Sequence, residues 1–358
     1  MRIGYSMWGF LGDGVLDTPD GSRSYRSALI DELMSAGHDV VFLQRNRDLL
    51  DAGDDLRGRY RWDDELPDLD VLMVEWRWRL RGRNDTPCGS TGHTCDLHRQ
   101  HELLEHYTRD RTLPTLIWDL DRQLAERDAL RSWPNVTVAD FALQQRPGVL
   151  ALPCPVPDAL LDTADPVALA AAARPTSLVY VGNQYDRDPA FAKYFAPAAA
   201  RVSHEVAGKW PRTGAWPHVT FTGRCAYPDV AGKHRRSLTT VLLMPDRYAA
   251  VAAMGSRWFE SVTAGCLPLA PAELALAEVF VPAELRVVSA ADVLDRIAWL
   301  RGIQGSPEHA DLIRACLACL EPFRTSRQVA YLTQVLRTMT NPPARDPAAA
   351  SATTPNRS

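Results

Sequence analysis

Short apolar runs alternate with segments of helical spacing through the first half of the chain. Apolar residues recur every three or four positions over residues 24–36, which predicts a helix that Gly37 ends. Strands before and after this helix complete a β-α-β unit, so the sheet should be parallel with right-handed crossovers. A further helix is predicted near 97–109. The strands predicted for this half span residues 2–6, 39–43, 69–75, 115–118 and 135–139.

The second half repeats this pattern after a stretch that contains Pro153, Pro155, Pro157 and Pro166. Near-continuous apolar runs again indicate strands that are covered on both faces. We therefore predict an α/β protein of two Rossmann-like domains, whose parallel sheets face a central cleft. The second half is predicted to contain strands at 177–181, 218–221, 240–244 and 267–270 and helices at 257–264 and 307–339.

The domain boundaries follow from these elements and from composition. A first domain is expected over residues 1–172 and a second over 173–322. A C-terminal helix at 323–340 is expected to pack back on the first domain. The tail at 341–358 is rich in Pro, Ala, Ser and Thr, and it is expected to be disordered.

Composition and charge narrow the choice of function. The chain has 358 residues, and a hydrophobic content of 46% is typical of a globular protein. Its seven cysteines are odd in number, which favours reduced thiols over a disulfide framework. It has no apolar run long enough for a membrane span, and we expect a cytoplasmic location. Residues 1–175 hold 20 arginines, no lysine and 29 acidic residues, a net charge of −9, whereas the remainder carries +5. The basic half would attract a nucleotide diphosphate, and the acidic half would repel a polyanion.

Two glycine-ended strands of the second half offer phosphate contacts. Gly182 and Asn183 follow the first of these strands, and Arg187 comes soon after them. A glycine lets backbone N–H groups approach a phosphate, and an arginine can pair with it. Gly223 and Arg224 end another strand in the same way. For both loops a plain structural turn is the alternative.

Arg257 and Glu260 form the most informative pair. They are three residues apart and therefore share one face of the predicted helix 257–264. At a helix N-terminus in the cleft, Arg257 would suit a diphosphate and Glu260 would accept hydrogen bonds from ribose hydroxyls. The alternative is a surface ion pair of little energetic weight.

Two aspartates follow the strand at 115–118. Asp119 is interpreted as a general base facing the cleft, and Asp121 as the cap of the following helix. Together they form an Asp-x-Asp pattern, and the alternative role of such a pattern is to hold Mg²⁺ or Mn²⁺ on a diphosphate. We assign no protein metal site here.

The roles of three other groups of residues are left open by the sequence. Trp8, Asp13, Glu75 and Trp76 follow first-domain strands and are candidate acceptor contacts. The arginines interleaved with tryptophans over 76–83 are typical of nucleic-acid contact, but the negative charge of this half opposes it. A local role near the acceptor pocket, or internal ion pairing, is favoured for this run instead. The remaining group has the residue types of a zinc site, but its spacing fits no common zinc pattern and a plain loop is favoured. It consists of Cys88, His93, Cys95 and His98.

The motifs of the second half resemble those of GT-B glycosyltransferases. The matching runs are Val-Tyr-Val-Gly-Asn, Phe-Thr-Gly-Arg, Leu-Leu-Met-Pro-Asp-Arg-Tyr, Arg-Trp-Phe-Glu-Ser-Val-Thr-Ala-Gly-Cys and Val-Leu-Asp-Arg-Ile, within residues 176–302. Within this class the chain is most similar to the phage DNA β-glucosyltransferases. The resemblance implies that Arg257 and Gly182 contact the diphosphate, that Glu260 binds the ribose and that Asp119 is the base. It also implies an acceptor-binding first domain and a donor-binding second domain.

The resemblance implies transfer of a sugar, by default from UDP-glucose. Retaining relatives carry a glutamate eight residues before Glu260, where this chain has Ala252, so an inverting reaction is favoured. We expect a small hydroxylated acceptor such as a nucleoside-like or other secondary metabolite, as in antibiotic biosynthesis. The alternatives are glucosylation of hydroxymethylated DNA bases, which the acidic first half opposes, and a non-catalytic sugar-nucleotide-binding module.

Overall fold

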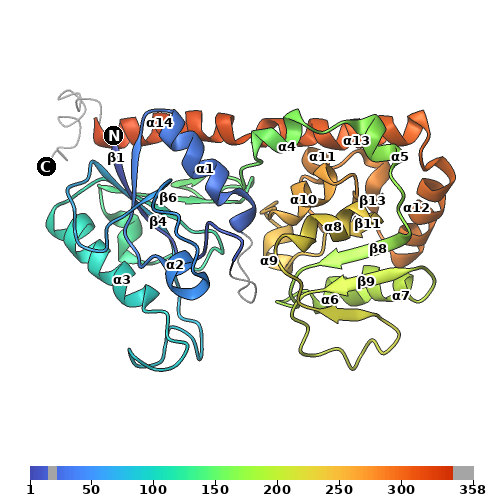
Figure 1. Cartoon of the computed structure of the whole chain (residues 1–358), viewed down its shortest axis with the longest axis horizontal. Helices are drawn as coiled ribbons and strands as arrows, with labels where there is room; N and C mark the ends of the chain where they lie inside the picture. Colours follow the sequence, from blue (N-terminus) through green and yellow to red (C-terminus); the bar gives the residue numbers. More distant parts are fainter. Residues whose placement is uncertain (15–21, 342–358) are drawn as a thin grey trace, which may run out of the picture.

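The computed structural model describes residues 1–14 and 22–341, which form two α/β domains lying side by side (Figure 1). Each domain contains one sheet in which all strands are parallel, as predicted. The first sheet has the order β3-β2-β1-β4-β5-β6-β7 and the second β10-β9-β8-β11-β12-β13. The first-sheet strands are β1 Arg2–Ser6, β2 Asp39–Phe42, β3 Arg61–Trp62, β4 Val71–Glu75, β5 Thr115–Trp118, β6 Val136–Asp140 and β7 Val149–Ala151.

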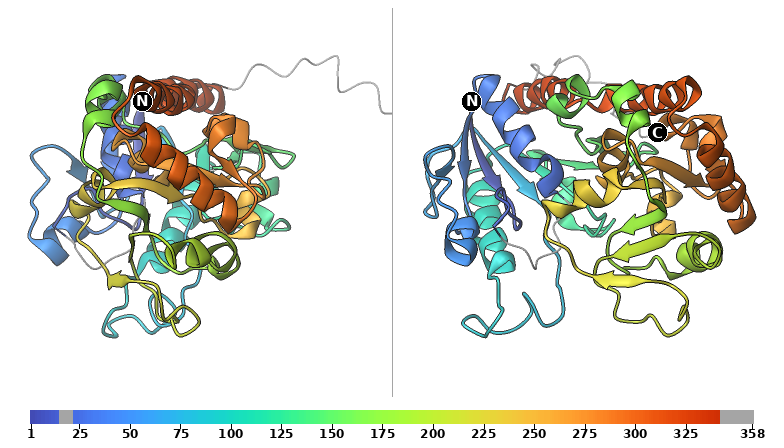
Figure 2. Two further views of the ribbon diagram at one scale, coloured as in Figure 1. Left: turned by 90° about the vertical axis from the view of Figure 1, so that its right-hand side faces the viewer. Right: turned by 45° about the vertical axis from the view of Figure 1, so that its right-hand side comes forward.

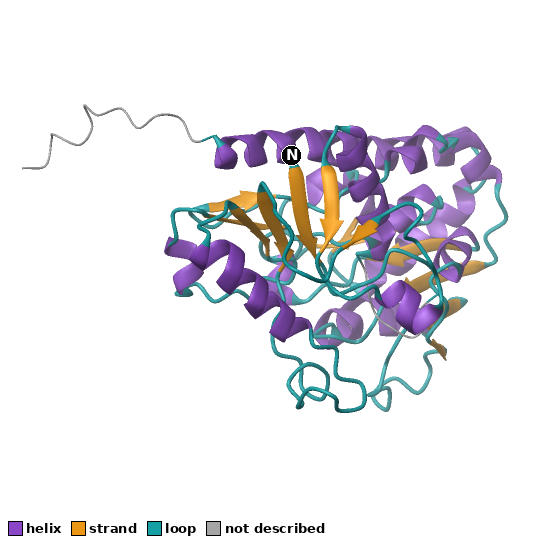
Figure 3. Ribbon diagram, turned by 60° about the vertical axis from the view of Figure 1, so that its left-hand side comes forward, coloured by secondary structure: helices purple, strands orange, loops and turns teal. Residues whose placement is uncertain are grey.

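Alternating residues of the central strands pack against opposite layers of helices. In β4, Val71 and Met73 join the core that includes helix α1, whereas Leu72 and Val74 join a second cluster with Leu103 of helix α3. Both faces are therefore buried, which explains the continuous apolar runs in the sequence. The strands of the first sheet lie between helices in Figure 3.

The second sheet differs from the prediction at two strands. The strand expected at 218–221 is displaced to β10, and the one expected at 240–244 begins and ends earlier, as β11. The short strands β3, β7, β9 and β13 were not predicted, because runs of two to four residues carry too little periodicity. The second-sheet strands are β8 Thr176–Val181, β9 His204–Ala207, β10 Phe221–Gly223, β11 Ser237–Val241, β12 Leu267–Pro271 and β13 Arg286–Val287.

Most helices cover the two sheets, and none in the part described is long and apolar enough to cross a membrane. A π-helical segment, Leu104–Asp110, extends α3, and another, Phe191–Phe195, joins α6 to α7. The helices are α1 Arg23–Ser35, α2 Arg47–Ala52, α3 Asp96–Leu103, α4 Asp158–Asp162, α5 Pro166–Ala171, α6 Asp188–Ala190, α7 Ala196–Ala199, α8 Asp229–Arg235, α9 Asp246–Ala249, α10 Arg257–Thr263, α11 Ala277–Phe280, α12 Ala290–Ile303, α13 Pro307–Leu320 and α14 Thr325–Thr340.

The single helix expected at 307–339 is two helices, α13 and α14. A 3₁₀ turn at Glu321–Phe323 separates them, because Pro322 has no N–H to continue the α-helical pattern. The two helices run along one side of both domains (Figures 1 and 2). Helix α14 packs on α1 of the first domain, where Thr333 lies 3.0 Å from His38 Nε2. Of the tail expected to be disordered, residues 342–358 lie outside the described residues.

The chain crosses between the domains at two adjacent segments. The Val156 N–H donates to the Phe323 carbonyl at 2.8 Å, and the Thr325 N–H donates back to the Val156 carbonyl at 2.9 Å. Arg324 pairs with Asp158 and Asp162 beside them. The two crossings are therefore tied into one connection, which fixes where the domains meet.

The turn from α10 to β12 needs a glycine, and we expect Gly265→Ala to destabilise the protein. Gly265 has a φ of 71°, and an added Cβ would lie 2.3 Å from an Arg174 guanidinium nitrogen. A left-handed alanine costs roughly 1–3 kcal/mol before that clash is counted. Urea unfolding should show a loss of at least this size, whereas Gly214→Ala, whose methyl would meet nothing within 4 Å, should unfold close to wild type. Equal effects of the two changes would contradict this account.

Candidate functional site

A cavity of about 590 Å³ lies between the two domains. Its walls come from the loops that follow β1, β4, β5 and β6 in the first sheet and β8 and β11 in the second, so the carboxyl ends of both sheets meet there. The first domain contributes Trp8, Ser22, Tyr25, Trp78, Leu80, Arg83, Leu120, Asp121, Gln123 and Phe141. The second contributes, among others, Gly182, Asn183, Asp186, Arg187, His234, Arg247, Tyr248, Ser256 and Arg257.

Arg257 is the first residue of α10 and lines the cavity, as predicted. Its side chain is 36% exposed and forms an ion pair with Glu260, whose side chain is 9% exposed. Glu260 also accepts a hydrogen bond from Ser24 of α1, so it links the two domains. Burial would raise the pKa of Glu260, but the Arg257 charge and the Ser24 hydrogen bond outweigh it and hold this pKa below its usual value.

This geometry changes the interpretation of the Arg257–Glu260 pair. Arg257 reaches the cavity wall, whereas Glu260 is not part of the lining and already has two partners. The ion pair considered as the alternative is present, but it is largely buried and joins the two domains.

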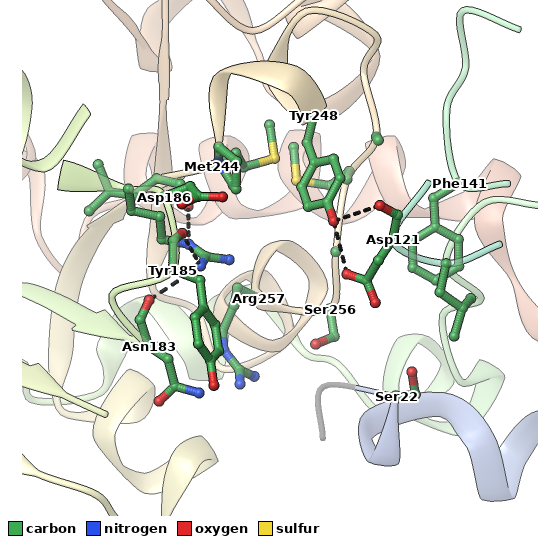
Figure 4. Close-up of a pocket in the computed structure, with 18 of the residues that line it drawn as sticks. Ser22, Asp121, Phe141, Asn183, Tyr185, Asp186, Met244, Tyr248, Ser256 and Arg257 are labelled. Atoms are coloured by element: carbon green, nitrogen blue, oxygen red, sulfur yellow. Dashed lines mark hydrogen bonds between the residues drawn. The ribbon is translucent and has the colours of Figure 1, made fainter. Parts of the chain in front are cut away.

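The positions of Asp119 and Asp121 do not match the assignment made from the sequence. Asp119 is 2% exposed, and its carboxylate accepts the backbone N–H groups of Gln123 at 2.8 Å and Leu124 at 3.0 Å. Asp119 is therefore the residue that caps the turn after β5, and it does not line the cavity. Asp121, two residues further along, has its carboxylate at the cavity wall (Figure 4).

Asp121 is held by a tyrosine of the opposite domain. The Tyr248 hydroxyl donates to Asp121 Oδ1 at 2.9 Å, across the domain boundary (Figure 4). Burial raises the pKa of Asp121, while the Tyr248 hydrogen bond and the charge of Arg77 oppose the rise. A carboxylate of raised pKa on a cavity wall is suited to accept a proton.

The loop after β8 lines the cavity through Gly182, Asn183 and Arg187, but its backbone is already engaged. The Gly182 N–H donates to the Ala207 carbonyl at 2.8 Å, so it is not available to a phosphate as the sequence suggested. Arg187 donates to the carbonyls of Leu243 and Tyr185 at 3.1 and 2.9 Å. The guanidinium is thereby fixed at the cavity wall.

The structure places Gly223 and Arg224 away from the cavity. They end β10, which is the edge strand of the second sheet, and both are exposed. Gly223 has a φ of 74°, and its carbonyl accepts the Gly208 N–H at 2.8 Å. The turn at Gly223 is therefore structural, and we no longer assign a donor contact to this pair.

Of the four acceptor candidates, only Trp8 lines the cavity. Asp13 is exposed elsewhere, and Trp76 packs between apolar clusters on the far side of the sheet. Glu75 is fully buried and accepts two hydrogen bonds from Arg26, at 2.8 and 2.9 Å, and one from Tyr5 at 2.8 Å. Its carboxylate is thus an internal partner for a buried arginine and has no contact with the cavity.

Sequence reasoning missed several cavity residues. Tyr248 and Arg247 belong to a run that was recognised as a motif, but neither was assigned a role. His234 on α8 is 1% exposed, and neither ring nitrogen has a hydrogen-bond partner in the part of the chain described. Burial lowers the pKa of His234 to about 4, so the ring is neutral. Phe141 follows a strand end, which was the available signal. Trp78 lies in the run 76–83, for which a local role near an acceptor pocket was one of the two favoured interpretations.

The carboxylates of the cavity give limited support for a divalent cation. A cation held mainly by phosphates needs one or two protein carboxylates. The described lining has Asp121, which is bonded to Tyr248, and Asp186, which is paired with Arg247. Both are already engaged, so these residues do not form a ready metal site, and we derive no step through a metal ion.

Comparisons with known proteins show which folds this architecture resembles. No protein-family model and no curated protein matches the chain. Among solved structures, T4 phage β-glucosyltransferase in complex with UDP and Mn²⁺ is 13% identical with a TM-score of 0.62, over 95% of this chain and 100% of that one. An α-glucosyltransferase with UDP-glucose and DNA containing an abasic site is 9% identical with a TM-score of 0.62, over 94% and 99% of the two chains.

A third similar structure is AviGT4, a glycosyltransferase of avilamycin A biosynthesis, at 13% identity and a TM-score of 0.54, over 95% of this chain and 98% of the other. At these identities the likeness concerns the fold. The two α/β domains with parallel sheets of seven and six strands agree with it. The chain therefore has the GT-B glycosyltransferase fold and resembles the phage DNA β-glucosyltransferase in its architecture.

Proposed function

We propose that the protein is a glycosyltransferase that binds a nucleotide-activated sugar, by default UDP-glucose, on its second domain and a hydroxylated acceptor on its first. The observation that carries this proposal is the cavity between the two sheets. The second-domain wall presents three arginines, Arg187, Arg247 and Arg257, and the first-domain wall presents the carboxylate of Asp121. The similar structures named for UDP and UDP-glucose support the choice of donor.

The reaction we infer is a single displacement that inverts the anomeric carbon. Asp121 takes the proton of the acceptor hydroxyl, whose oxygen forms the new bond to the anomeric carbon. The bond from that carbon to the diphosphate oxygen breaks, and the nucleoside diphosphate leaves with the electron pair. Arg257 and Arg187 stabilise the developing charge of this leaving group. Ala252 supports inversion, because it stands where retaining relatives carry a glutamate.

The acceptor we propose is a small molecule with an aromatic or apolar body. The first-domain wall consists largely of aromatic and apolar side chains, which favour such a surface. A DNA duplex would need a strongly positive face, and the net charge of residues 1–175 is −9. The aromatic and apolar residues of this wall are Trp8, Tyr25, Trp78, Leu80, Leu120 and Phe141.

A donor screen followed by an acceptor assay tests the proposal. Nucleotide sugars are first ranked by the rise they cause in melting temperature, because a ligand of the native state stabilises it by mass action. The best donor is then incubated with small hydroxylated acceptors and with duplex DNA containing hydroxymethylated bases, and products are weighed by mass spectrometry. Transfer to DNA alone would replace the small acceptor with a nucleic acid. Donor binding without transfer would indicate a non-catalytic module.

The pH dependence of transfer should report Asp121. Because the pKa of Asp121 is raised, the loss of kcat/KM with falling pH should begin at a higher pH than for an ordinary aspartate. Tyr248→Phe removes a hydrogen bond that favours the charged carboxylate, so this acid limb should move to higher pH. Tyr331→Phe on α14, far from the cavity lining, should leave the limb in place. An acid limb unchanged by Tyr248→Phe would argue against Asp121 as the titrating group.

A further inference from the structure

Residues 76–95 connect β4 to α3 without a helix or strand of their own. This loop projects below the first domain in both Figures 1 and 2. Loops longer than about 12–15 residues without regular structure are uncommon in compact domains and are usually functional. The loop contributes Trp78, Leu80 and Arg83 to the cavity wall, so its conformation shapes the site.

Four potential metal ligands lie at the far end of this loop and at the start of α3. The ligand atoms of Cys88, His93 and Cys95 all lie within 4.8 Å of one another. Cys88 Sγ is 3.5 Å from His93 Nε2. Zn–S and Zn–N bonds of about 2.3 and 2.0–2.1 Å in a tetrahedron place such atoms about 3.6 Å apart, which agrees with this distance.

A fourth ligand is available one helical turn beyond Cys95. His98 Nδ1 lies 2.8 Å from Cys88 Sγ, which is closer than two ligands of one zinc ion stand. His98 is exposed and lies outside the group of three whose ligand atoms are mutually within 4.8 Å, so it would join the site by reorienting its side chain. Two thiolates and two imidazoles form a donor set that selects Zn²⁺ over Mg²⁺ or Ca²⁺.

The surroundings of His93 fix the ring in an orientation suited to a metal. Its other nitrogen, Nδ1, lies 3.1 Å from the Thr86 hydroxyl, so Nδ1–H can donate to this oxygen. The lone pair is then on Nε2, which faces Cys88. Such partners hold a ligating histidine in the required tautomer, and their loss typically lowers metal affinity by about 10–100-fold.

We propose that Cys88, His93, Cys95 and His98 bind a structural Zn²⁺ that holds the loop 76–95 in place beside the cavity. Asn84 links the two ends of this loop. Its side chain accepts the Leu80 N–H at 2.6 Å and donates to the Trp78 carbonyl at 3.0 Å, and it lies 3.4 Å from Asp96 Oδ2, next to Cys95. The metal thereby acts on the acceptor wall, a consequence that rests on the proposed function, whereas the metal site itself does not.

The test measures metal binding without reference to activity. The full-length chain, purified under reducing conditions with zinc present, should contain about one Zn²⁺ per chain by elemental mass spectrometry. After chelation, Co²⁺ should bind at the same stoichiometry, with the visible bands of tetrahedral cobalt and the near-ultraviolet charge transfer of thiolate ligands. Cys88→Ser and Cys95→Ser should lose both signals, and Thr86→Val should weaken binding about tenfold or more.

Cys225→Ser is the matched control, because Cys225 is a half-buried thiol outside the cluster and should bind Co²⁺ as wild type does. Circular dichroism identifies any variant that fails to fold. Absence of tetrahedral Co²⁺ binding in the folded wild type, or binding that survives in both serine variants, would overturn the proposal. An intact mass lower by two hydrogens, restored by reductant and absent in the serine variants, would show a Cys88–Cys95 disulfide instead. If the metal binds but no sugar is transferred, the zinc site stands and the proposed function fails.

Discussion

Asp121→Asn is expected to lower kcat by roughly 10²- to 10⁴-fold while leaving the dissociation constant of the donor near its wild-type value. The amide keeps a carbonyl that accepts the Tyr248 hydroxyl, so the contact across the domain boundary survives. The amide cannot take up the proton of the acceptor's hydroxyl group, so the chemical step slows. Single-turnover transfer measures the rate, and calorimetric titration of the donor measures the affinity.

Asp119→Asn provides the comparison that separates the two aspartates. Its carboxylate accepts two backbone N–H groups, from Gln123 and Leu124, and an amide accepts only one of them well. The free energy of unfolding should therefore fall by about 1–3 kcal/mol, with much smaller changes in kcat. If Asp119→Asn abolishes transfer in a folded protein while Asp121→Asn remains active, the assignment made from the sequence is the correct one.

Removal of Arg257 should weaken donor binding more than removal of a basic residue elsewhere in the same domain. A hydrogen bond to a charged group contributes about 1.5–3 kcal/mol, so Arg257→Ala should raise the dissociation constant of a nucleoside diphosphate by roughly 10–100-fold. Arg212→Ala is the control. Its side chain is 73% exposed, pairs with Asp188 and does not line the cavity, so its effect should be small.

The Arg257 variant has a second consequence that must be measured apart from binding. Without Arg257, the largely buried Glu260 carboxylate keeps only the hydrogen bond from Ser24, and the protein should lose stability. The double variant Arg257→Ala, Glu260→Ala removes this unpaired charge and should recover stability without recovering donor affinity. Recovery of affinity in the double variant would mean that Arg257 acts through the domain contact and has no role on the diphosphate.

The fold was predictable because its signals are local. Buried parallel strands of four to six residues appear as continuous apolar runs, and Gly37 and Gly265 mark turns by their conformational needs. The break between α13 and α14 was missed, although Pro322 is its cause, because apolar spacing continues on both sides. The short edge strands were missed because pairing with a neighbour, which periodicity does not reveal, is what makes them strands.

The sequence determined by itself that this chain forms two parallel α/β domains, that polar loops follow their strands, and that Arg257 begins a helix at the cleft. It did not determine which polar side chains face the cavity, because successive residues after a strand point in different directions and the turn decides which one is buried. Only the tertiary structure made Asp119 the capping residue, placed Asp121 at the cavity wall, buried Glu75 against Arg26, and brought Tyr248 across to Asp121. It also brought Cys88, His93 and Cys95 together, since the loop that joins them has no regular period from which their distances follow.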